Sequence, residues 1–364
     1  MFRQQKYKKN GFFPRVKKKK VFYDIENIFL TLCFLSNDSK YFTIMKNAIA
    51  IDIGGTNIKY ALVDETGKIS LESVCSSKSD ESNTTLEQLK AAIKELLAYA
   101  SHNNLEVAGI GIGVPSVVDD GLVLFANNLK EIDNINLKDV IGEEFNIPVF
   151  VDNDANLMGL GETRYGKAKD VTDVVFLTIG TGIGGTLIIN GRLWGGYRNR
   201  GTELGHIIIN CDGKSCSCGA SGCLEAYASV TALIEDYKEL LSNNNIIISP
   251  DTIIDGRYIV SQYMKNEEYA VEAMNAHFKY MAAGIAGMIN IFAPQKVILG
   301  GGITESGDFY IENISRLTMQ QVMKETSCYV SIEAASLGNK AGFYGAAALV
   351  FKASKPVCDK SASI

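Results

Sequence analysis

The chain has 364 residues, of which 46% are apolar, so it is long enough to bury a large core and favours two domains over one. This ordinary composition argues against disordered, collagen-like and solenoid classes. The net charge of -5 is unevenly distributed: residues 1–44 carry ten Lys/Arg and three Asp/Glu, and the remainder carries 26 and 38. An acidic body argues against nucleic-acid partners, because a phosphate backbone requires a cationic surface.

Residues 1–45 form a basic stretch without a periodic pattern, which we interpret as an N-terminal extension that is disordered or lies upstream of the native start. Its apolar run, Ile28 to Leu35, has eight residues, whereas about 20 are needed to span a bilayer. The run is long enough for a signal peptide, but no small-residue cleavage site follows it. A regular globular pattern begins directly after Met45. A short targeting or contact tail is the alternative interpretation, and no membrane partner is expected.

Short apolar strands alternate with helical segments from Asn47 onward. Leucines and alanines at three- and four-residue spacing predict one helix at 86–100. The other expected elements are two strands joined by a glycine turn at 48–64, strands at 107–114 and 148–154, a hairpin at 174–191, a long helix at about 271–291, a strand at 296–303 and a last helix through 342–351. This alternation is typical of an α/β architecture with mostly buried sheets.

Two distant segments share one design, in which a glycine-rich turn that carries Thr joins two apolar strands: AIDIGGTNIKYALV at 50–63 and FLTIGTGIGGTLII at 176–189. Any β-hairpin can carry glycine, but both turns are richer in it than a two-residue connection needs. Backbone N–H groups of glycine can approach phosphate oxygens closely, so both turns are interpreted as phosphate-binding halves of one site. Thr56 and Thr181 would add hydroxyl donors. Asp52 would hold Mg²⁺ through water, unless it merely forms the turn.

Two common nucleotide motifs do not fit. Gly180, Gly182 and Gly185 have the spacing of a dinucleotide fingerprint, but a strand-like segment follows them where that fingerprint requires a helix. The sequence Gly-Lys-Ser at 213–215 ends like a Walker A motif, but Ile208 occupies the position of its first glycine.

Polar residues form the end of the strand expected at 148–154, where open α/β sheets bind ligands. Phosphoryl transfer needs positioning, charge neutralisation and one acceptor for the hydroxyl proton. Asn153 would orient a hydroxyl group and Asp154 would accept its proton. Asp154 could equally be the N-cap of the helix that begins here.

A cluster of His and Cys in the segment 203–229 predicts a metal site. His206, Cys216, Cys218 and Cys223 have the spacing His-x9-Cys-x-Cys-x4-Cys, within a loop too poor in apolar residues to be core. Three thiolates and one imidazole complete a tetrahedral Zn²⁺ site without an open position, which is structural rather than catalytic. Cys211 could compete as a ligand. The clustering argues against a disulfide scaffold and favours the cytoplasm.

Glu203 and Glu225 stand on either side of this loop. Glutamates are normally solvated surface residues. A loop fixed by zinc would hold them rigidly, however, and paired acceptors suit the vicinal hydroxyl groups of a sugar.

Together these segments resemble the ROK family, which combines sugar kinases with sugar-responsive repressors. The similarity runs from about Ala48 to Phe351 and rests on DIGGTNIK, GIGVPSVVD, VDNDAN, GTGIGG, ELGH, CSCGASGCLE and LGGGI. The resemblance implies an α/β, two-domain actin-like/hexokinase-like (ribonuclease H-like) ATPase fold with a cleft between the domains. The small domain is expected at 46–166 plus a C-terminal helix at about 345–358. The larger domain, with the zinc loop, is expected at 167–344.

The resemblance also implies a role for each matching position. Asp154 is similar to the catalytic base of the family. The sugar-binding set would be Ser116, Asn127, Asn153, Asp154, Glu203, His206 and Glu225. The ATP-binding set would be Asp52, Gly54, Gly55, Thr56, Asn57, Lys59, Thr181, Gly182, Gly300, Gly301 and Gly302. The family favours His206, Cys216, Cys218 and Cys223 as the zinc ligands.

Two positions depart from the family pattern. The common GVPG segment is GVPS here, with Ser116 beside the expected sugar site, and GIGGG is GIGGT, with Thr186. Ser116 requires a backbone angle that a residue other than glycine can adopt. This departure bears on the preferred sugar and leaves the class of reaction unchanged.

The implied function is ATP-dependent phosphorylation of the 6-hydroxyl of a hexose, with ATP, Mg²⁺ and structural Zn²⁺ as cofactors. Glucose is the first expected substrate, then N-acetylglucosamine or N-acetylmannosamine, then fructose or mannose. The alternatives are a sugar-responsive repressor, which would carry a winged helix-turn-helix before the DIGGT segment, and a zinc-stabilised sugar-binding protein without turnover. Family members are usually oligomers, so a homodimer or homotetramer is expected.

Overall fold

The computed structural model describes residues 45–78, 84–126, 129–249 and 251–353, and Met45–Ile364 fall into one compact unit. The predicted extension, apart from Met45, and Asn127 lie outside the described residues. The described residues contain no helix long and apolar enough to cross a bilayer.

The first of two five-stranded sheets has the order β3-β2-β1-β4-β7. Its strands are β1 Lys46–Ile53, β2 Asn57–Asp64, β3 Ile69–Ser76, β4 Glu106–Val114 and β7 Val149–Asn153. β1, β2 and β3 pair antiparallel, whereas β1, β4 and β7 run parallel. The parallel register aligns Asp52 with Gly113 and Gly113 with Asp152. Polar residues that are a hundred positions apart in the chain therefore end at one edge of the sheet.

The second sheet repeats this plan with the order β10-β9-β8-β11-β12. Its strands are β8 Val174–Ile179, β9 Ile183–Ile189, β10 Arg192–Leu193, β11 Lys296–Gly300 and β12 Ser331–Ala334. β8 and β9 form an antiparallel hairpin, and β8, β11 and β12 run parallel. Both predicted glycine hairpins are thus present, each beside parallel strands of its own sheet. A separate two-stranded sheet pairs β5 Val117–Asp119 with β6 Leu122–Leu124.

Helices cover both sheets. α2 begins after Thr84, whose hydroxyl and the Glu87 side chain form a reciprocal capping box, and its apolar face packs on β2, β3 and β4. The helices near the first sheet are α2 Thr85–His102, α3 Leu137–Phe145, α4 Asp154–Tyr165 and α11 Ala341–Ala353. Those near the second are α5 Glu225–Ala228, α6 Val230–Asn243, α7 Gly256–Tyr263, α8 Glu268–Phe292, α9 Asp308–Met319 and α10 Lys324–Ser327.

Most element predictions agree with the structure, and the last helix predicted through 342–351 is present as α11 Ala341–Ala353. The C-terminal helix expected at about 345–358 for the small domain starts at Ala341 in the structure, and residues 354–358 lie outside the described part of the chain. The domain boundary between 166 and 167 stays a prediction.

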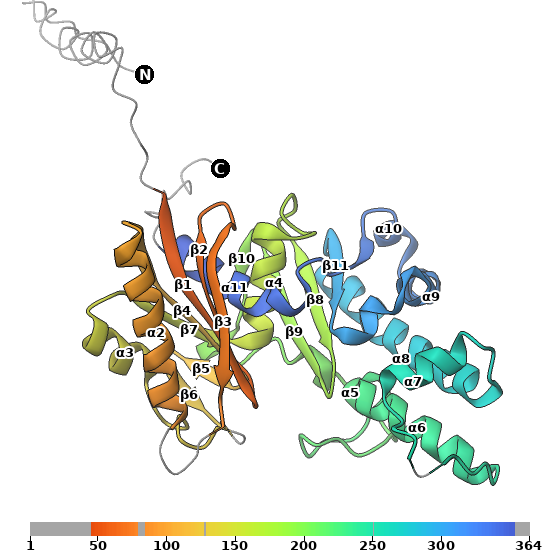
Figure 1. Cartoon of the computed structure of the whole chain (residues 1–364). Helices are drawn as coiled ribbons and strands as arrows, with labels where there is room; N and C mark the ends of the chain where they lie inside the picture. The colour runs from red at the N-terminus through yellow and green to blue at the C-terminus, as the bar shows by residue number, and fades with distance from the viewer. Residues whose placement is uncertain (1–44, 79–83, 127–128, 250, 354–364) are drawn as a thin grey trace, which may run out of the picture. The chain divides into compact units, whose positions relative to one another are not determined.

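α4 and α11 pack against each other between the two sheets (Figure 1). α11 also contacts β1 and β4, whereas α4 contacts β7 together with β8 and β9. A methyl group at Gly345 would come within 1.7 Å of the Leu157 carbonyl oxygen, and one at Gly111 within 2.2 Å of the Ala346 oxygen. Only glycine allows these close backbone approaches, which bind α11 to both α4 and β4.

A fully buried carboxylate, Glu162, fixes the far end of α4. Glu162 Oε1 accepts hydrogen bonds of 2.8 Å from the N–H groups of both Ser336 and Leu337, just before α11. Glu162 Oε2 accepts from Lys167 N at 2.9 Å and from the Ser336 hydroxyl at 3.1 Å. With four donors, this carboxylate ties α4 to the loop that leads into α11.

Replacing Glu162 by Gln should therefore destabilise the fold. An amide turns an NH₂ group toward backbone N–H donors, and a lost hydrogen bond to a charged group costs about 1.5–3 kcal/mol. We expect Glu162→Gln to lower the free energy of unfolding by about 2–4 kcal/mol in urea titrations. Glu239→Gln, at an exposed position of α6, is the matched control and should change it little. Equal stability of both variants would contradict the assigned role of Glu162.

Candidate functional site

The carboxyl edge of the first sheet gathers acidic side chains. Asp52 lies near the end of β1, and β7 leads directly into α4, whose first residue is Asp154. The charges of Asp52 and Glu203 both act on the Asp154 carboxyl group. Three predicted site residues from distant parts of the sequence are therefore close enough to interact electrostatically.

The start of α4 corrects the helix-cap alternative for Asp154. Asn153 is the N-cap: its Oδ1 accepts from the N–H groups of Ala155 at 2.9 Å and Asn156 at 3.3 Å. Asp154 is already helical and accepts one 2.8 Å hydrogen bond from Ala155 N. An amide satisfies the first backbone donors without a charge, so the Asp154 carboxylate is not needed as the cap.

Burial at this edge changes the acidity of Asp154. Desolvation raises its pKa to about 6, the hydrogen bond from Ala155 N opposes the shift, and the negative charges of Asp52 and Glu203 add to it. Desolvation also raises the pKa of Asp52, and Lys59 partly offsets that effect. A carboxyl group with a pKa near 6 can accept a proton at neutral pH more readily than an ordinary Asp.

The first glycine hairpin lies open beside Asp52. Gly54 N donates to the Asn57 carbonyl at 2.8 Å, and Asn57 Nδ2 lies 3.2 Å from Thr56 Oγ1. Gly55 and Thr56 are exposed, and a methyl group at Gly55 would meet no atom within 4 Å. The loop therefore has room for a ligand over its backbone. Lys59, predicted at the ATP site, donates to the Asn339 carbonyl at 3.2 Å, and its positive charge acts on Asp52.

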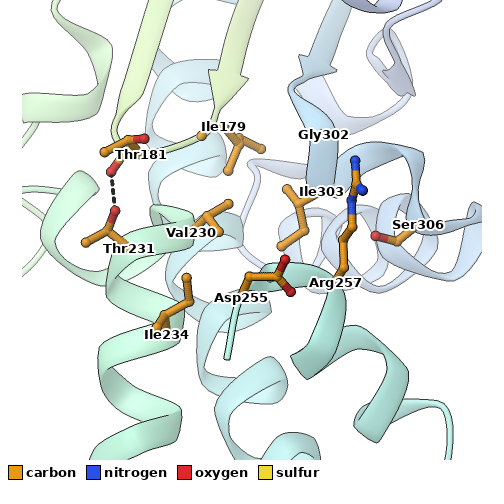
Figure 2. A pocket seen from close by; sticks show the side chains of 12 residues that line it. Ile179, Thr181, Val230, Thr231, Ile234, Asp255, Arg257, Gly302, Ile303 and Ser306 are labelled. Carbon is orange, nitrogen blue, oxygen red and sulfur yellow. Dashed lines mark hydrogen bonds between the residues drawn. The ribbon is translucent and has the colours of Figure 1, made fainter. Parts of the chain in front are cut away.

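The second glycine hairpin forms one wall of a pocket of about 320 Å³ (Figure 2). Thr181 and Gly302, both predicted at the ATP site, line it together with Gly180. The hairpin is fixed to α6, because Val230 N donates to Gly180 O at 2.9 Å and the Thr231 hydroxyl donates to Thr181 O at 2.8 Å.

The turn after β11 reaches the same pocket. Gly301 has a φ of +100°, and a methyl group there would come within 2.0 Å of the Ile179 carbonyl oxygen, so only glycine fits between β11 and β8. Gly300 ends β11, and Gly302 faces open space. The structure thus brings the predicted Thr181 and Gly302 together in one pocket, whereas the predicted Gly182 lines a neighbouring cavity beside Glu225.

Sequence reasoning missed the other side of this pocket. Asp255 and Arg257, at the start of α7, point into it, and Arg257 and Ser306 lie opposite Thr181 and Thr231 (Figure 2). Ile234 on α6 adds an apolar surface. α6 and α7 carry no recognisable motif, so no sequence signal marked these residues.

The predicted zinc ligands converge. The side-chain ligand atoms of His206, Cys216, Cys218 and Cys223 all lie within 4.8 Å of one another. Cys216 Sγ is 3.6 Å from His206 Nδ1, and Cys218 Sγ is 3.6 Å from Cys223 Sγ. Tetrahedral coordination with the usual zinc bond lengths separates such atoms by about 3.5–3.8 Å. The donor set and its spacing fit Zn²⁺, and Cys211 is not among the four.

Glu225 links this loop to the second hairpin. Its Oε2 accepts from Ile183 N at 2.8 Å, and its Oε1 lies 3.3 Å from Ser217 Oγ. A methyl group at Gly182 would come within 2.4 Å of Oε2, so the glycine lets the glutamate approach the hairpin. Glu203 directly precedes the short 3₁₀ helix Leu204–His206.

Ser116 lies beside α4, and its backbone is not in the left-handed region, as its departure from the glycine pattern requires. Its carbonyl oxygen accepts from Asn153 Nδ2 at 3.2 Å. Its hydroxyl is buried and has no hydrogen-bond partner among the described residues. The hydrogen-bonding capacity of this hydroxyl is therefore not used by the described residues.

Arg198 and Asn199, in the segment before Glu203, contact residues near the carboxyl edge of the first sheet. The sequence analysis did not identify either of them. Arg198 forms an ion pair with Asp119 at 2.6 Å, and Asn199 Nδ2 donates to Asp152 Oδ1 at 3.0 Å and to Val118 O at 3.1 Å. Arg198 and Asn199 both have positive φ, which lets the loop turn sharply toward the first sheet. Asn is common in that conformation, and this is the only hint that the sequence offers.

Comparison with known proteins places these features in one family. The model of the ROK family matches residues 48–353. The chain belongs to the ROK family. Within that family it is 33% identical to a glucokinase of Thermotoga maritima over 310 residues, 83% of this chain and 96% of the relative. It is 31% identical to a xylose repressor of Caldicellulosiruptor bescii, over 83% of this chain and 77% of that protein.

A solved ROK structure shows the same fold. The ROK glucokinase from Streptomyces griseus, in complex with glucose and AMPPNP, superposes with a TM-score of 0.66 at 31% identity, covering 84% of this chain and 99% of that one. The chain therefore has the two-domain actin-like fold of ROK sugar kinases.

Removing one thiolate from the cluster tests the zinc prediction. Cys218→Ser should lose the single bound zinc per chain, measured by mass spectrometry of metals after dialysis, because an alcohol is a poor zinc ligand. It should also unfold at a lower temperature. Cys211→Ser is the matched control and should keep both properties. A Cys218→Ser protein that retains a full equivalent of zinc would contradict the assignment.

Proposed function

We propose that the chain transfers the γ-phosphoryl group of ATP to the 6-hydroxyl of a hexose, with Asp154 as general base. One observation carries the proposal: Asp154 is a desolvated carboxyl group with a pKa of about 6, within electrostatic reach of Asp52 beside one open glycine hairpin. The family relationship to sugar kinases supports the same chemistry.

In the proposed reaction, the hexose 6-oxygen attacks the γ-phosphorus atom while its proton passes to the Asp154 carboxylate. The bond from the γ-phosphorus to the bridging oxygen breaks, and ADP leaves with both electrons. Asp52 would hold Mg²⁺ through water, and that ion would neutralise phosphate charge. Both glycine hairpins would donate backbone N–H groups to phosphate oxygens, and the pocket in Figure 2 would receive the nucleoside.

The sugar would bind on the zinc-loop side of Asp154. Glu203 and Glu225 would accept from its hydroxyl groups, and the buried Ser116 hydroxyl would face them. His206 turns Nδ1 toward Cys216, which leaves Nε2 for the sugar. His206, Cys216, Cys218 and Cys223 would hold Zn²⁺ as a structural ion, which would orient His206 and the loop without taking part in the transfer.

Glucose is the first proposed substrate. The similar glucokinases of Thermotoga maritima and Streptomyces griseus support it. N-acetylglucosamine, N-acetylmannosamine, fructose and mannose follow. We also propose a cytoplasmic homodimer or homotetramer.

The resemblance to xylose repressors makes a sugar-responsive regulator the second candidate. Asp154 and both open hairpins favour turnover, because a regulator needs neither a general base nor a phosphate site.

Replacing the proposed base tests the mechanism. In a coupled assay of ADP release with each of the five candidate sugars, we expect the wild-type chain to turn over at least one. Asp154→Asn should lower kcat on that sugar by about 10²–10⁴, because the isosteric amide cannot accept the proton, while the KM for the sugar changes little. Asp139→Asn, at an exposed position in the first turn of α3, is the matched control and should keep full activity.

Failure of the wild-type chain to release ADP with any of these sugars would contradict the proposed reaction. Sugar-dependent binding of promoter DNA without turnover would favour the regulator instead.

A further inference from the structure

A basic cavity lies away from the candidate site, between α4, α11 and the turn after β9. Its volume is about 390 Å³, within the range of small-molecule sites. Arg164, Lys169 and Lys352 line it, and none of the other lining residues is acidic. It shares no residue with the predicted sugar, ATP or zinc sites. Residues 45–364 carry 26 basic and 38 acidic side chains, so such a concentration of cations needs an explanation.

The three cations lack carboxylate partners in the described part of the chain. Other lysines do pair, such as Lys90 with Glu144 and Lys296 with Glu333, at 2.6 and 2.9 Å. No ion pair involves the cations that line the cavity. Their charge is thus available to a ligand.

Arg164 is held in place by uncharged groups. Its guanidinium carbon lies 5.4 Å from the ring centre of Tyr165 and 5.1 Å from that of Phe351. Arg164 Nε donates to Tyr165 Oη at 3.0 Å, and a longer contact of 3.4 Å joins Nη2 to Glu65 O. Stacking and neutral acceptors fix the guanidinium, and no carboxylate of the described residues forms an ion pair with it, which preorganises it for an anion.

Lys352 is partly desolvated and lies near a further positive charge. Partial desolvation and the nearby charge of Arg192 lower its pKa, and Asp152 is the acidic group that opposes the shift. A bound anion would reduce the repulsion between Lys352 and Arg192. Both positive charges would in turn stabilise the anion.

We propose that this cavity is a binding site for a phosphate-bearing small molecule. Arg164 would provide a planar pair of donors, and Lys169 and Lys352 would close over the remaining oxygens. The ligand is inorganic phosphate or a phosphomonoester, since both present the same oxygens to these cations. Its contacts would join α4 and α11 to the turn at Gly191.

Isothermal titration calorimetry of the full chain tests this site. The nucleotide site is first saturated with AMPPNP and Mg²⁺, and ionic strength is held constant with chloride. Inorganic phosphate and glycerol 3-phosphate are the two probes. Both should bind the wild-type chain, and the tighter one identifies the source of the phosphate group.

A double variant assigns the binding to the cavity. Lys169→Gln with Lys352→Gln should weaken phosphate binding about tenfold or more, because each substitution removes a charge-assisted hydrogen bond. AMPPNP binding should stay unchanged. Lys238→Gln with Lys279→Gln makes the same change in net charge at exposed positions of α6 and α8, and should bind phosphate like the wild type.

Three results would overturn the proposal. They are no binding of either probe to the wild-type chain, unchanged binding by the cavity variant, and an equal loss in both double variants. The last would mean that phosphate responds only to net charge.

Discussion

The burial of two carboxyl groups, at the end of β1 and the start of α4, is the constraint on which the rest of the site depends. Asp52 and Asp154 are both desolvated, and each loses part of the hydration that would stabilise its charge. Lys59 offsets this only for Asp52. Such an arrangement is costly for the free protein, and the proposed binding of Mg²⁺ and a sugar hydroxyl would relieve that cost. The cost therefore supports the proposed catalytic role of these carboxyl groups.

The helices between the sheets keep this arrangement in place. α4 carries Asp154 at its first residue and Glu162 near its end, so one rigid element joins the reactive edge to the loop before α11. α11 in turn lies close to Asp52: a methyl group at Gly342 would come within 2.4 Å of the Asp52 carboxyl carbon. Asn199 adds a hydrogen bond from the second half of the chain to Asp152. α4, α11 and the loop that carries Asn199 thus all contribute to the positions of the acidic side chains at this edge of the first sheet.

Much of this could be predicted from the sequence, because it depends on local signals. The glycine hairpins, the zinc spacing and the strand before Asp154 are contiguous motifs, and the fold that they imply is confirmed. The alternative that Asp154 caps α4 was wrong by one residue, because Asn and Asp side chains can both cap a helix and Asn153 is the observed N-cap. Asp255, Arg257 and Asn199 were missed because they reach the site only through tertiary packing. The basic cavity is likewise assembled from residues that are nearly 190 positions apart.

The dependence of kcat/KM on pH tests the central claim most directly. An Asp154 base with a pKa of about 6 must be ionised to accept the proton, so the rate should be constant above about pH 7. It should fall about tenfold per pH unit below about pH 6, as protonation removes the base. Asp154→Asn should lose this step in its residual rate. A wild-type rate that stays constant down to about pH 4.5, or the same step in the variant, would contradict the role of Asp154 as the base.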